Sequence, residues 1–233
     1  MAVTAKSLGS SSRLISRWEE RATSRVLEAR RDQILERSRQ LVDAAHQLLE
    51  EKGLEGLTIR AVLKRTGLSR RAFYERFRDK DELVLAVFEQ TILMATRHYR
   101  AQIDALPEPV ERLKLIVTSL LLAKSSPEAK AGSGRRGAAM SREHLRLAES
   151  RPDDLQAALS PLLSLIAQQL SEGMAAGAVR RDDPQRLASL VYNLVSTTVH
   201  TELLTQKTAR PDWAKRVQLA AETWEFCRRA IAA

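Results

Sequence analysis

Residues 57–83 of this 233-residue chain narrow its possible folds more than any other stretch does. The sequence LTIRAVLKRTGLSRRAFYERFRDKDEL reads as two short helices joined by a tight turn, with another helix beginning behind them. Thr58 and Ser69 have the short polar side chains that cap helix N-termini. Gly67 lies between the two segments and can adopt the left-handed conformation that ends a helix. The spacing therefore predicts a helix-turn-helix.

The positive charge of the chain is concentrated around this stretch. The formal net charge is +9, of which +7 falls in residues 1–80 and +2 in residues 81–233. Seven Lys and Arg residues precede the acidic patch that ends the stretch. A basic helix-turn-helix next to a nearly neutral remainder is typical of a protein in which one region meets DNA.

The second helix of such a motif points the side chains at its start toward base edges in the major groove. Ser69, Arg70 and Arg71 occupy those positions, and either arginine could make a bidentate contact with guanine O6 and N7. Tyr74 and Arg76 are expected on the exposed side of the same helix. The pattern predicts that this helix reads the DNA sequence.

A further capping signal starts the next helix. Asp79 and Glu82, three residues apart, form a variant of the capping box. Lys80 in the first turn is placed to reach a phosphate beside free backbone N–H groups. The expected DNA-binding residues are thus Thr58, Ser69, Arg70, Arg71, Tyr74, Arg76 and Lys80.

Residues 31–88 resemble the TetR-type bacterial transcriptional repressors. The residues that carry the family fingerprint are Thr58, Val62, Leu63, Gly67, Leu68, Ser69, Phe73, Tyr74, Phe77, Lys80 and Leu83. The resemblance implies that Tyr74 and Lys80 hold phosphates, while the start of the helix after Gly67 reads bases. Phe73 and Phe77 would pack inside the DNA-binding head.

The resemblance also implies an all-α fold with two parts. An N-terminal three-helix DNA-binding domain with the helix-turn-helix precedes a C-terminal helical domain for ligand binding and dimerisation. We expect a basic extension, partly disordered or helical, in residues 1–29, the DNA-binding domain in residues 30–79 and the second domain in residues 80–233. The implied function is a repressor that binds a palindromic operator as a homodimer and is released by a small molecule.

Helical periodicity and capping signals predict the remaining elements. Apolar residues recur at helical spacing in residues 31–52, and Gly53 ends that helix. The other predicted helices cover about residues 80–106, 110–124, 140–149, 153–176, 184–205 and 211 onward. Residues 125–139 are expected to be a flexible loop. Their GxGxxG pattern is not expected to bind a nucleotide because no strand precedes it.

The last two helices resemble the pair through which the family forms a four-helix bundle with a second copy. Candidate interface residues are Leu190, Leu194, Val195, Thr198, Leu203, Trp213, Val217, Ala220, Ala221 and Trp224. The alternative is that many of these side chains fill the core of a single protomer.

The resemblance places a ligand pocket inside the C-terminal bundle. The apolar candidates for its wall are Phe88, Ile92, Leu120, Met140, Leu163, Ile166 and Met174, and ordinary core packing is the alternative for each. The polar candidates that could orient a ligand are His98, His144, Tyr192, Asn193 and His200. Aromatic residues make up only 4% of the chain, which favours an aliphatic effector over a planar cationic drug.

The basic extension has more than one interpretation. Arg13, Arg17, Arg21 and Arg25 recur every four residues and would share one face of a helix. That face could lie along DNA phosphates, or it could be a solvated face paired with nearby glutamates. A third interpretation is an anionic membrane surface, where binding would follow lipid charge instead of DNA sequence.

Other classes of function receive less support. No cluster has metal-ligand spacing, no cofactor motif is present, and nothing marks a catalytic nucleophile beside a base, so an enzyme is least expected. The main rival is a constitutive DNA-binding architectural protein without a ligand, favoured if the C-terminal bundle holds no cavity. The lone Cys227 and the lack of an apolar run of membrane length predict a protein of the reducing cytoplasm, outside the membrane.

Overall fold

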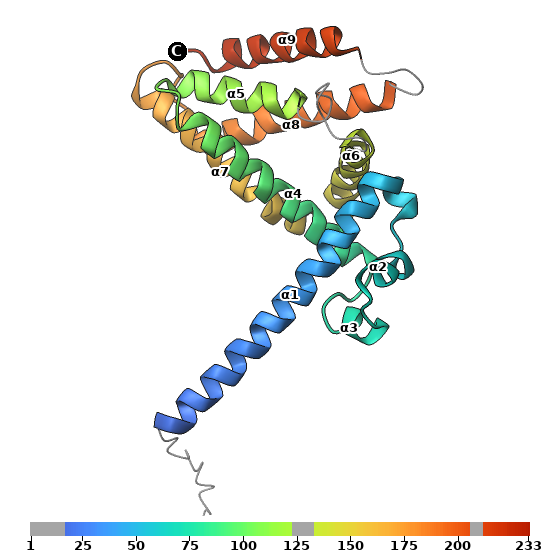
Figure 1. Cartoon of the computed structure of the whole chain (residues 1–233). Helices are drawn as coiled ribbons and strands as arrows, with labels where there is room; N and C mark the ends of the chain where they lie inside the picture. The colour runs from blue at the N-terminus through green and yellow to red at the C-terminus, as the bar shows by residue number, and fades with distance from the viewer. Residues whose placement is uncertain (1–16, 123–132, 206–211) are drawn as a thin grey trace, which may run out of the picture. The chain divides into compact units, whose positions relative to one another are not determined.

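The computed structural model describes residues 17–122, 133–205 and 212–233, which form nine helices (Figure 1). They are α1 (Arg17–Gly56), α2 (Ile59–Thr66), α3 (Arg70–Tyr74), α4 (Lys80–Ile103), α5 (Pro109–Leu122), α6 (Ser133–Ser150), α7 (Pro152–Ala175), α8 (Pro184–Thr205) and α9 (Trp213–Ile231). The predicted all-α fold is confirmed. The chain divides into two compact units, Met1–Gln40 and Leu41–Ala233.

Helix α1 begins at Arg17, well before the predicted start near residue 31. Its backbone leaves helical geometry at Gly53, where φ is 66° and ψ is −167°. A positive φ costs glycine little, and this explains the predicted end of the regular helix. The first part of the helix, residues 17–30, is exposed where its side chains are described. Residues 1–16 lie outside the described part of the chain.

The helix-turn-helix has the predicted caps. The Thr58 hydroxyl accepts from the Ala61 backbone N–H at 3.1 Å, and the Ser69 hydroxyl accepts from the Ala72 N–H at 3.1 Å. Gly67 ends α2 with a φ of 70°. Side-chain acceptors thus satisfy backbone donors that the first turn of each helix leaves free. These short-range signals position α3 immediately after the turn.

A buried core holds this head together. Phe73 is fully buried, Phe77 is nearly so, and their ring centroids lie 5.8 Å apart. They belong to the same core cluster as Leu41, Val62 and buried residues of α4. The predicted packing role of both phenylalanines is confirmed.

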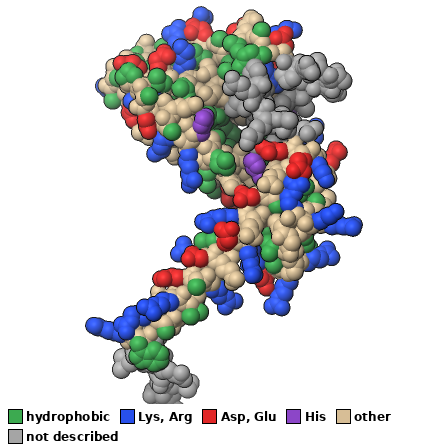
Figure 2. Space-filling view, viewed as in Figure 1, with side chains coloured by type: hydrophobic (Ala, Val, Ile, Leu, Met, Phe, Trp, Pro, Cys, Tyr) green, Lys and Arg blue, Asp and Glu red, His purple; other side chains and the backbone are tan. Residues whose placement is uncertain are grey.

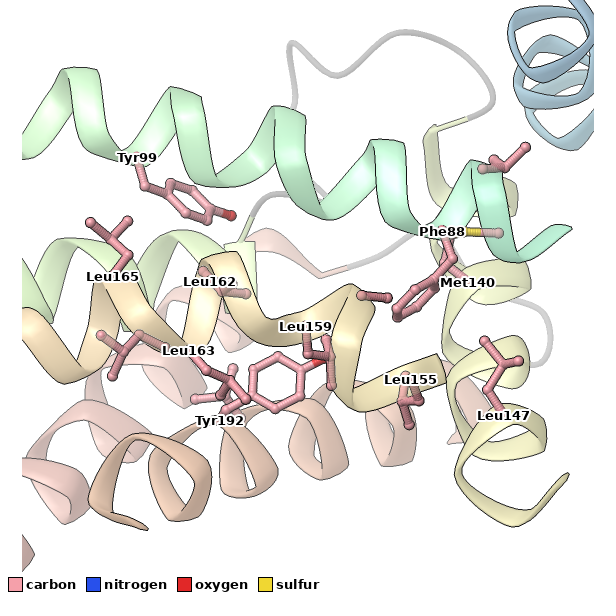
Figure 3. Close-up of a cluster of buried hydrophobic side chains, with 14 of the residues drawn as sticks. Phe88, Tyr99, Met140, Leu147, Leu155, Leu159, Leu162, Leu163, Leu165 and Tyr192 are labelled. Carbon is pink, nitrogen blue, oxygen red and sulfur yellow. The ribbon is translucent and has the colours of Figure 1, made fainter. Parts of the chain in front are cut away.

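Helices α4–α9 form the second bundle, with α7 at its centre. Helix α7 packs against α4, α5, α6 and α8, and α5 also contacts α8 and α9. Figure 3 shows Leu155, Leu159 and Leu163 projecting from α7 among side chains of the neighbouring helices. Pro161 lies inside α7, which continues through it as one helix.

Two predicted boundaries were wrong. Helix α6 starts at Ser133, so residues 133–139 are helical instead of part of a loop, and Gly134 and Gly137 of the GxGxxG pattern lie in that helix. Packing overrides the low helix propensity of glycine here, because Gly137 is buried against its neighbours. Helix α4 ends at Ile103, earlier than expected. Residues 123–132 lie outside the described part of the chain.

Candidate DNA interface and ligand cavity

The start of α3 presents an exposed polar and basic surface. Ser69, Arg70 and Arg71 are all exposed, and half of the Tyr74 surface is accessible at 50%. Lys and Arg side chains are visible over the α2–α3 region in Figure 2. These exposed groups lie at the start of α3, and Phe73 of the same short helix is buried in the core. Such an arrangement can enter a groove without disturbing the core.

Arg71 at the start of α3 has an ion-pair partner on the same stretch. Arg71 Nε donates to Glu75 Oε1 at 3.0 Å, and the Arg71 side chain is 90% exposed. The Arg71 guanidinium holds the pKa of Glu75 below its usual value, so this carboxylate stays ionised. Exposed ion pairs of this kind are weak. Arg71 can therefore exchange Glu75 for a guanine or a phosphate at small cost.

Arg76 does not have the predicted exposed position. Its side chain is only 6% exposed, and Nη1 donates to the carbonyl of Ala72 and approaches Glu75. A long side chain one turn beyond Ala72 can fold back along the helix and bury its stem there. The prediction that the Arg76 side chain is exposed is therefore wrong, and its contact with DNA stays a prediction.

Thr58 and Lys80 are the remaining predicted DNA-binding residues. Thr58 is exposed beside the α2 N-terminus, where its hydroxyl is already used as the cap. Lys80 is half-buried and its Nζ lies 3.5 Å from the carbonyl oxygen of Leu54. Because that contact is long, little is lost if the ammonium group turns to a phosphate.

The second bundle contains a cavity of about 720 Å³. Helix α4 supplies the most lining residues, α5, α6, α7 and α8 supply most of the others, and α1 and α9 add His46 and Trp213. Four of the seven apolar wall candidates line it: Phe88, Ile92, Leu120 and Met140. The polar candidates His98, His144, Tyr192 and His200 line it as well. Its size is typical of small-molecule sites in proteins.

Four other candidates lie away from the cavity. Leu163 and Ile166 are buried in the core around α7, where they contact neighbouring helices instead of open space. Met174 is near the end of α7 and also packs on the core. Asn193 is exposed, because it projects from α8 on the side opposite the buried Tyr192 and Val195. Their prediction as wall residues is corrected.

Hydrogen-bonded polar pairs connect α6 and α8 at the cavity. Ser141 Oγ lies 3.0 Å from His200 Nδ1, and Tyr192 Oη lies 3.4 Å from His144 Nδ1. Figure 3 shows Tyr192 reaching from α8 into the buried cluster next to α7. Burial raises the pKa of Tyr192, so its hydroxyl remains protonated and can donate. This side of the cavity can bind a polar group of a ligand.

The comparisons with known proteins agree with this arrangement. Residues 41–87 match the model of the bacterial regulatory proteins of the tetR family. The chain is 29% identical over 180 residues to the HTH-type transcriptional repressor Rv1474c of Mycobacterium tuberculosis, which covers 72% of this chain and 95% of that protein. These matches support a TetR-type transcriptional regulator.

Solved structures share the fold of the regulator. A TetR-family transcriptional regulator from Pectobacterium atrosepticum has a TM-score of 0.68 and 20% identity, covering 87% of this chain and 97% of that one. The transcriptional regulator FadR from Bacillus subtilis, in complex with stearoyl-CoA, has a TM-score of 0.64 and 18% identity, covering 82% and 98%. No described helix of the regulator is long and apolar enough to cross a bilayer.

Sequence reasoning missed how the ring side chains gather. All four histidines of the regulator line the cavity, together with Phe88, Tyr99, Tyr192 and Trp213. The low aromatic content of the whole chain therefore does not describe the cavity wall. No spacing could have revealed this, since the histidines lie on α1, α4, α6 and α8. Among the residues that the structure describes, no group of three or more His, Cys, Asp or Glu could hold a metal ion.

Proposed function

We propose that this regulator is a ligand-responsive repressor that binds a palindromic operator as a homodimer. The observation that carries the proposal is that α4 begins beside the helix-turn-helix head and continues along the wall of the cavity. Its first residue is Lys80, beside the head, and Phe88, Ile92 and Tyr99 further along it line the cavity. A ligand that moves α4 would therefore move the head. The cavity also argues against the rival, a constitutive architectural protein without a ligand.

Contacts between α6 and α4 give the cavity a second connection to the head. Arg146 Nη1 lies 3.0 Å from Asp81 Oδ2 in the first turn of α4, and the same guanidinium pairs with the buried Glu143. His144, on the same helix, lies against Phe88 with ring centroids 6.2 Å apart. A ligand that displaces α6 would thus act on the start of α4.

The effector is expected to be a small molecule with an aliphatic part. The apolar wall residues Ile92, Leu120 and Met140 support this prediction. The similar FadR structure holds stearoyl-CoA, whose acyl chain is aliphatic. No bound cofactor is included in the proposal. Because the proposed target is DNA, the proposed location of the regulator is the cytoplasm.

The proposed dimer forms through α8 and α9. Leu190 on α8 is 58% exposed, and Val217 and Ala221 on α9 are exposed as well, so they can meet a second copy. Val195, Ala220 and Trp224 are buried in the protomer and belong to its own core. The side chain of Leu203 lies outside the described residues. Sedimentation equilibrium at micromolar concentration tests the dimer directly.

The experiment that tests the whole proposal is a selection from random DNA duplexes at moderate salt. Two recognition helices related by a twofold axis should enrich a palindrome whose half-sites lie about one helical turn, roughly 34–36 Å, or somewhat more apart. A protein that enriches no sequence would end the repressor proposal. If only a single half-site is enriched, sequence-specific DNA binding stands and the proposed binding as a homodimer fails.

Replacing Lys80 with alanine is expected to weaken binding to all duplexes by a similar factor. A lysine that neutralises one phosphate contributes about 1 to the slope of log K against log salt, so the slope should fall by that amount. Tyr74→Phe should also weaken all duplexes alike, with the slope unchanged. Filter binding at roughly 50 to 200 mM salt, where such losses are large, measures the affinity and the salt slope of both variants. A loss confined to some sequences would contradict a phosphate role.

Removing the charge of the N-terminal helix tests the basic extension. Arg17, Arg21 and Arg25 are exposed on α1 at four-residue spacing, whereas Arg13 lies outside the described residues. If the three described arginines meet phosphates, their combined change to glutamine should reduce the salt slope by about 2 to 3. Unchanged affinity at every salt concentration would identify a solvated face. Binding of wild type, but not the variant, to anionic vesicles would support the membrane interpretation.

A further inference from the structure

The cavity wall has a chemical asymmetry that limits the ligand. The described residues that line the cavity are four histidines, His46, His98, His144 and His200, and otherwise residues that are apolar or uncharged polar. Asp, Glu, Lys and Arg are absent from the described lining residues, so no carboxylate there repels an anionic group of a ligand. The imidazole rings can also donate hydrogen bonds to such a group.

The Ser141–His200 pair provides a donor for such a group. Ser141 is buried and its Oγ lies 3.0 Å from His200 Nδ1. A serine and a neutral histidine have one donor proton each, and the bond between them uses one. Whichever tautomer is present, the pair therefore keeps one proton to donate to a ligand. Both residues line the cavity, so that proton is available where a ligand binds.

Nearby groups on the same two helices extend this polar side. Tyr192 precedes His200 by two turns of α8, and its hydroxyl lies 3.4 Å from His144, one turn beyond Ser141 on α6. A carboxylate accepts several hydrogen bonds through two oxygens, whereas an alcohol or ketone has one oxygen to offer. Hydrogen bonds to a charged acceptor are also stronger than neutral ones. The polar side therefore suits a carboxylate better than a neutral oxygen.

We propose that the effector is a monocarboxylic acid with an apolar body, anchored by its carboxylate at the Ser141–His200 pair. The inference rests on the proposed ligand-responsive function and assigns the chemical class of the ligand. The apolar body lies against Ile92, Leu120 and Met140, across the cavity volume of about 720 Å³.

Calorimetric titration with three probes that each carry a ten-carbon chain tests the charge of the polar group. Decanoate, decanol and decyltrimethylammonium share one chain, and 2-naphthoate provides a carboxylate on a different apolar body. At least one carboxylate should bind about tenfold or more tightly than decanol, as charge-assisted hydrogen bonds imply. Decyltrimethylammonium should bind most weakly. Equal affinity for the three probes with a ten-carbon chain, preference for the cation, or failure of both carboxylates to bind overturns the proposal.

Variants of the pair locate the anchor. Ser141→Ala and His200→Gln should each weaken carboxylate binding about tenfold while changing decanol binding by less than about twofold. Ser189→Ala is the matched control, because Ser189 lies on α8 outside the cavity and donates to the Gln185 carbonyl at 3.1 Å. Tyr192→Phe, which keeps the ring, replaces Ser141→Ala if that variant melts early. If folded variants of the pair bind the carboxylate as tightly as wild type, the Ser141–His200 pair does not bind it and the proposal is overturned.

Operator binding measured in parallel separates this inference from the proposed function. Wild type that binds the selected operator but neither carboxylate remains a DNA-binding regulator and loses only the ligand class. Wild type that binds a carboxylate but selects no DNA keeps the ligand class and loses the repressor proposal. With both intact, the carboxylate should release the operator at concentrations where decanol does not.

Discussion

Phe73→Ala is expected to lower the free energy of unfolding by about 3–5 kcal/mol, the usual loss for a fully buried aromatic side chain. The Phe73 ring is fully buried and contacts Phe77 in the core of the head. Alanine removes that contact area and leaves a cavity that short helices can only partly close. Denaturant titration followed by circular dichroism measures the change.

Its neighbour provides the control. Tyr74 is half exposed, and its ring stacks edge-on against Phe73 at 5.3 Å. Tyr74→Phe keeps this ring contact and removes only the hydroxyl, so the unfolding free energy should change by less than about 0.5 kcal/mol. A loss below about 1 kcal/mol for Phe73→Ala would show that the head is not organised around this ring.

Arg70→Ala is expected to change which operators bind, and not merely how tightly. A bidentate contact to guanine contributes about 1–3 kcal/mol of discrimination, so the variant should lose that preference at one base pair per half-site. Arg71→Ala should act in the same way at a neighbouring base pair. Because Arg71 is paired with Glu75 in the free protein, Glu75→Gln should leave its base preference intact. Selection repeated with each variant reads out the altered consensus.

A charge-matched variant keeps this test strict. Arg181 is exposed in the connection between α7 and α8, so Arg181→Ala removes one positive charge away from the head. Its consensus should equal that of wild type. If Arg70→Ala and Arg71→Ala also keep the wild-type consensus and lose affinity uniformly, both arginines hold phosphates and the bases are read elsewhere.

The local signals of the head were predictable because they act over a few residues. The capping hydroxyls of Thr58 and Ser69 and the positive φ of Gly67 depend on immediate neighbours, and each was found as expected. Arg76 was mispredicted for the opposite reason. Its helical position allows exposure, but the packing of its long stem beside Ala72 decides where the guanidinium lies.

The cavity shows the same division more sharply. Phe88, Ile92 and Met140 could be predicted as cavity residues because apolar side chains on bundle helices face either the core or a cavity. Periodicity could not separate them from Leu163 and Ile166, because helical spacing identifies a buried face without saying whether that face meets another helix or open space.

The helical class, the caps and turn of the head, and the concentration of positive charge near it could be predicted from the sequence, since all of these depend on short-range chemistry and composition. Which side chains share the cavity depends instead on how the helices pack. Ser141 and His200 are far apart in the chain and meet because α6 packs against α8. Packing between helices brings together residues that no spacing in the sequence relates, and it is this packing that gives the regulator a polar site for a ligand.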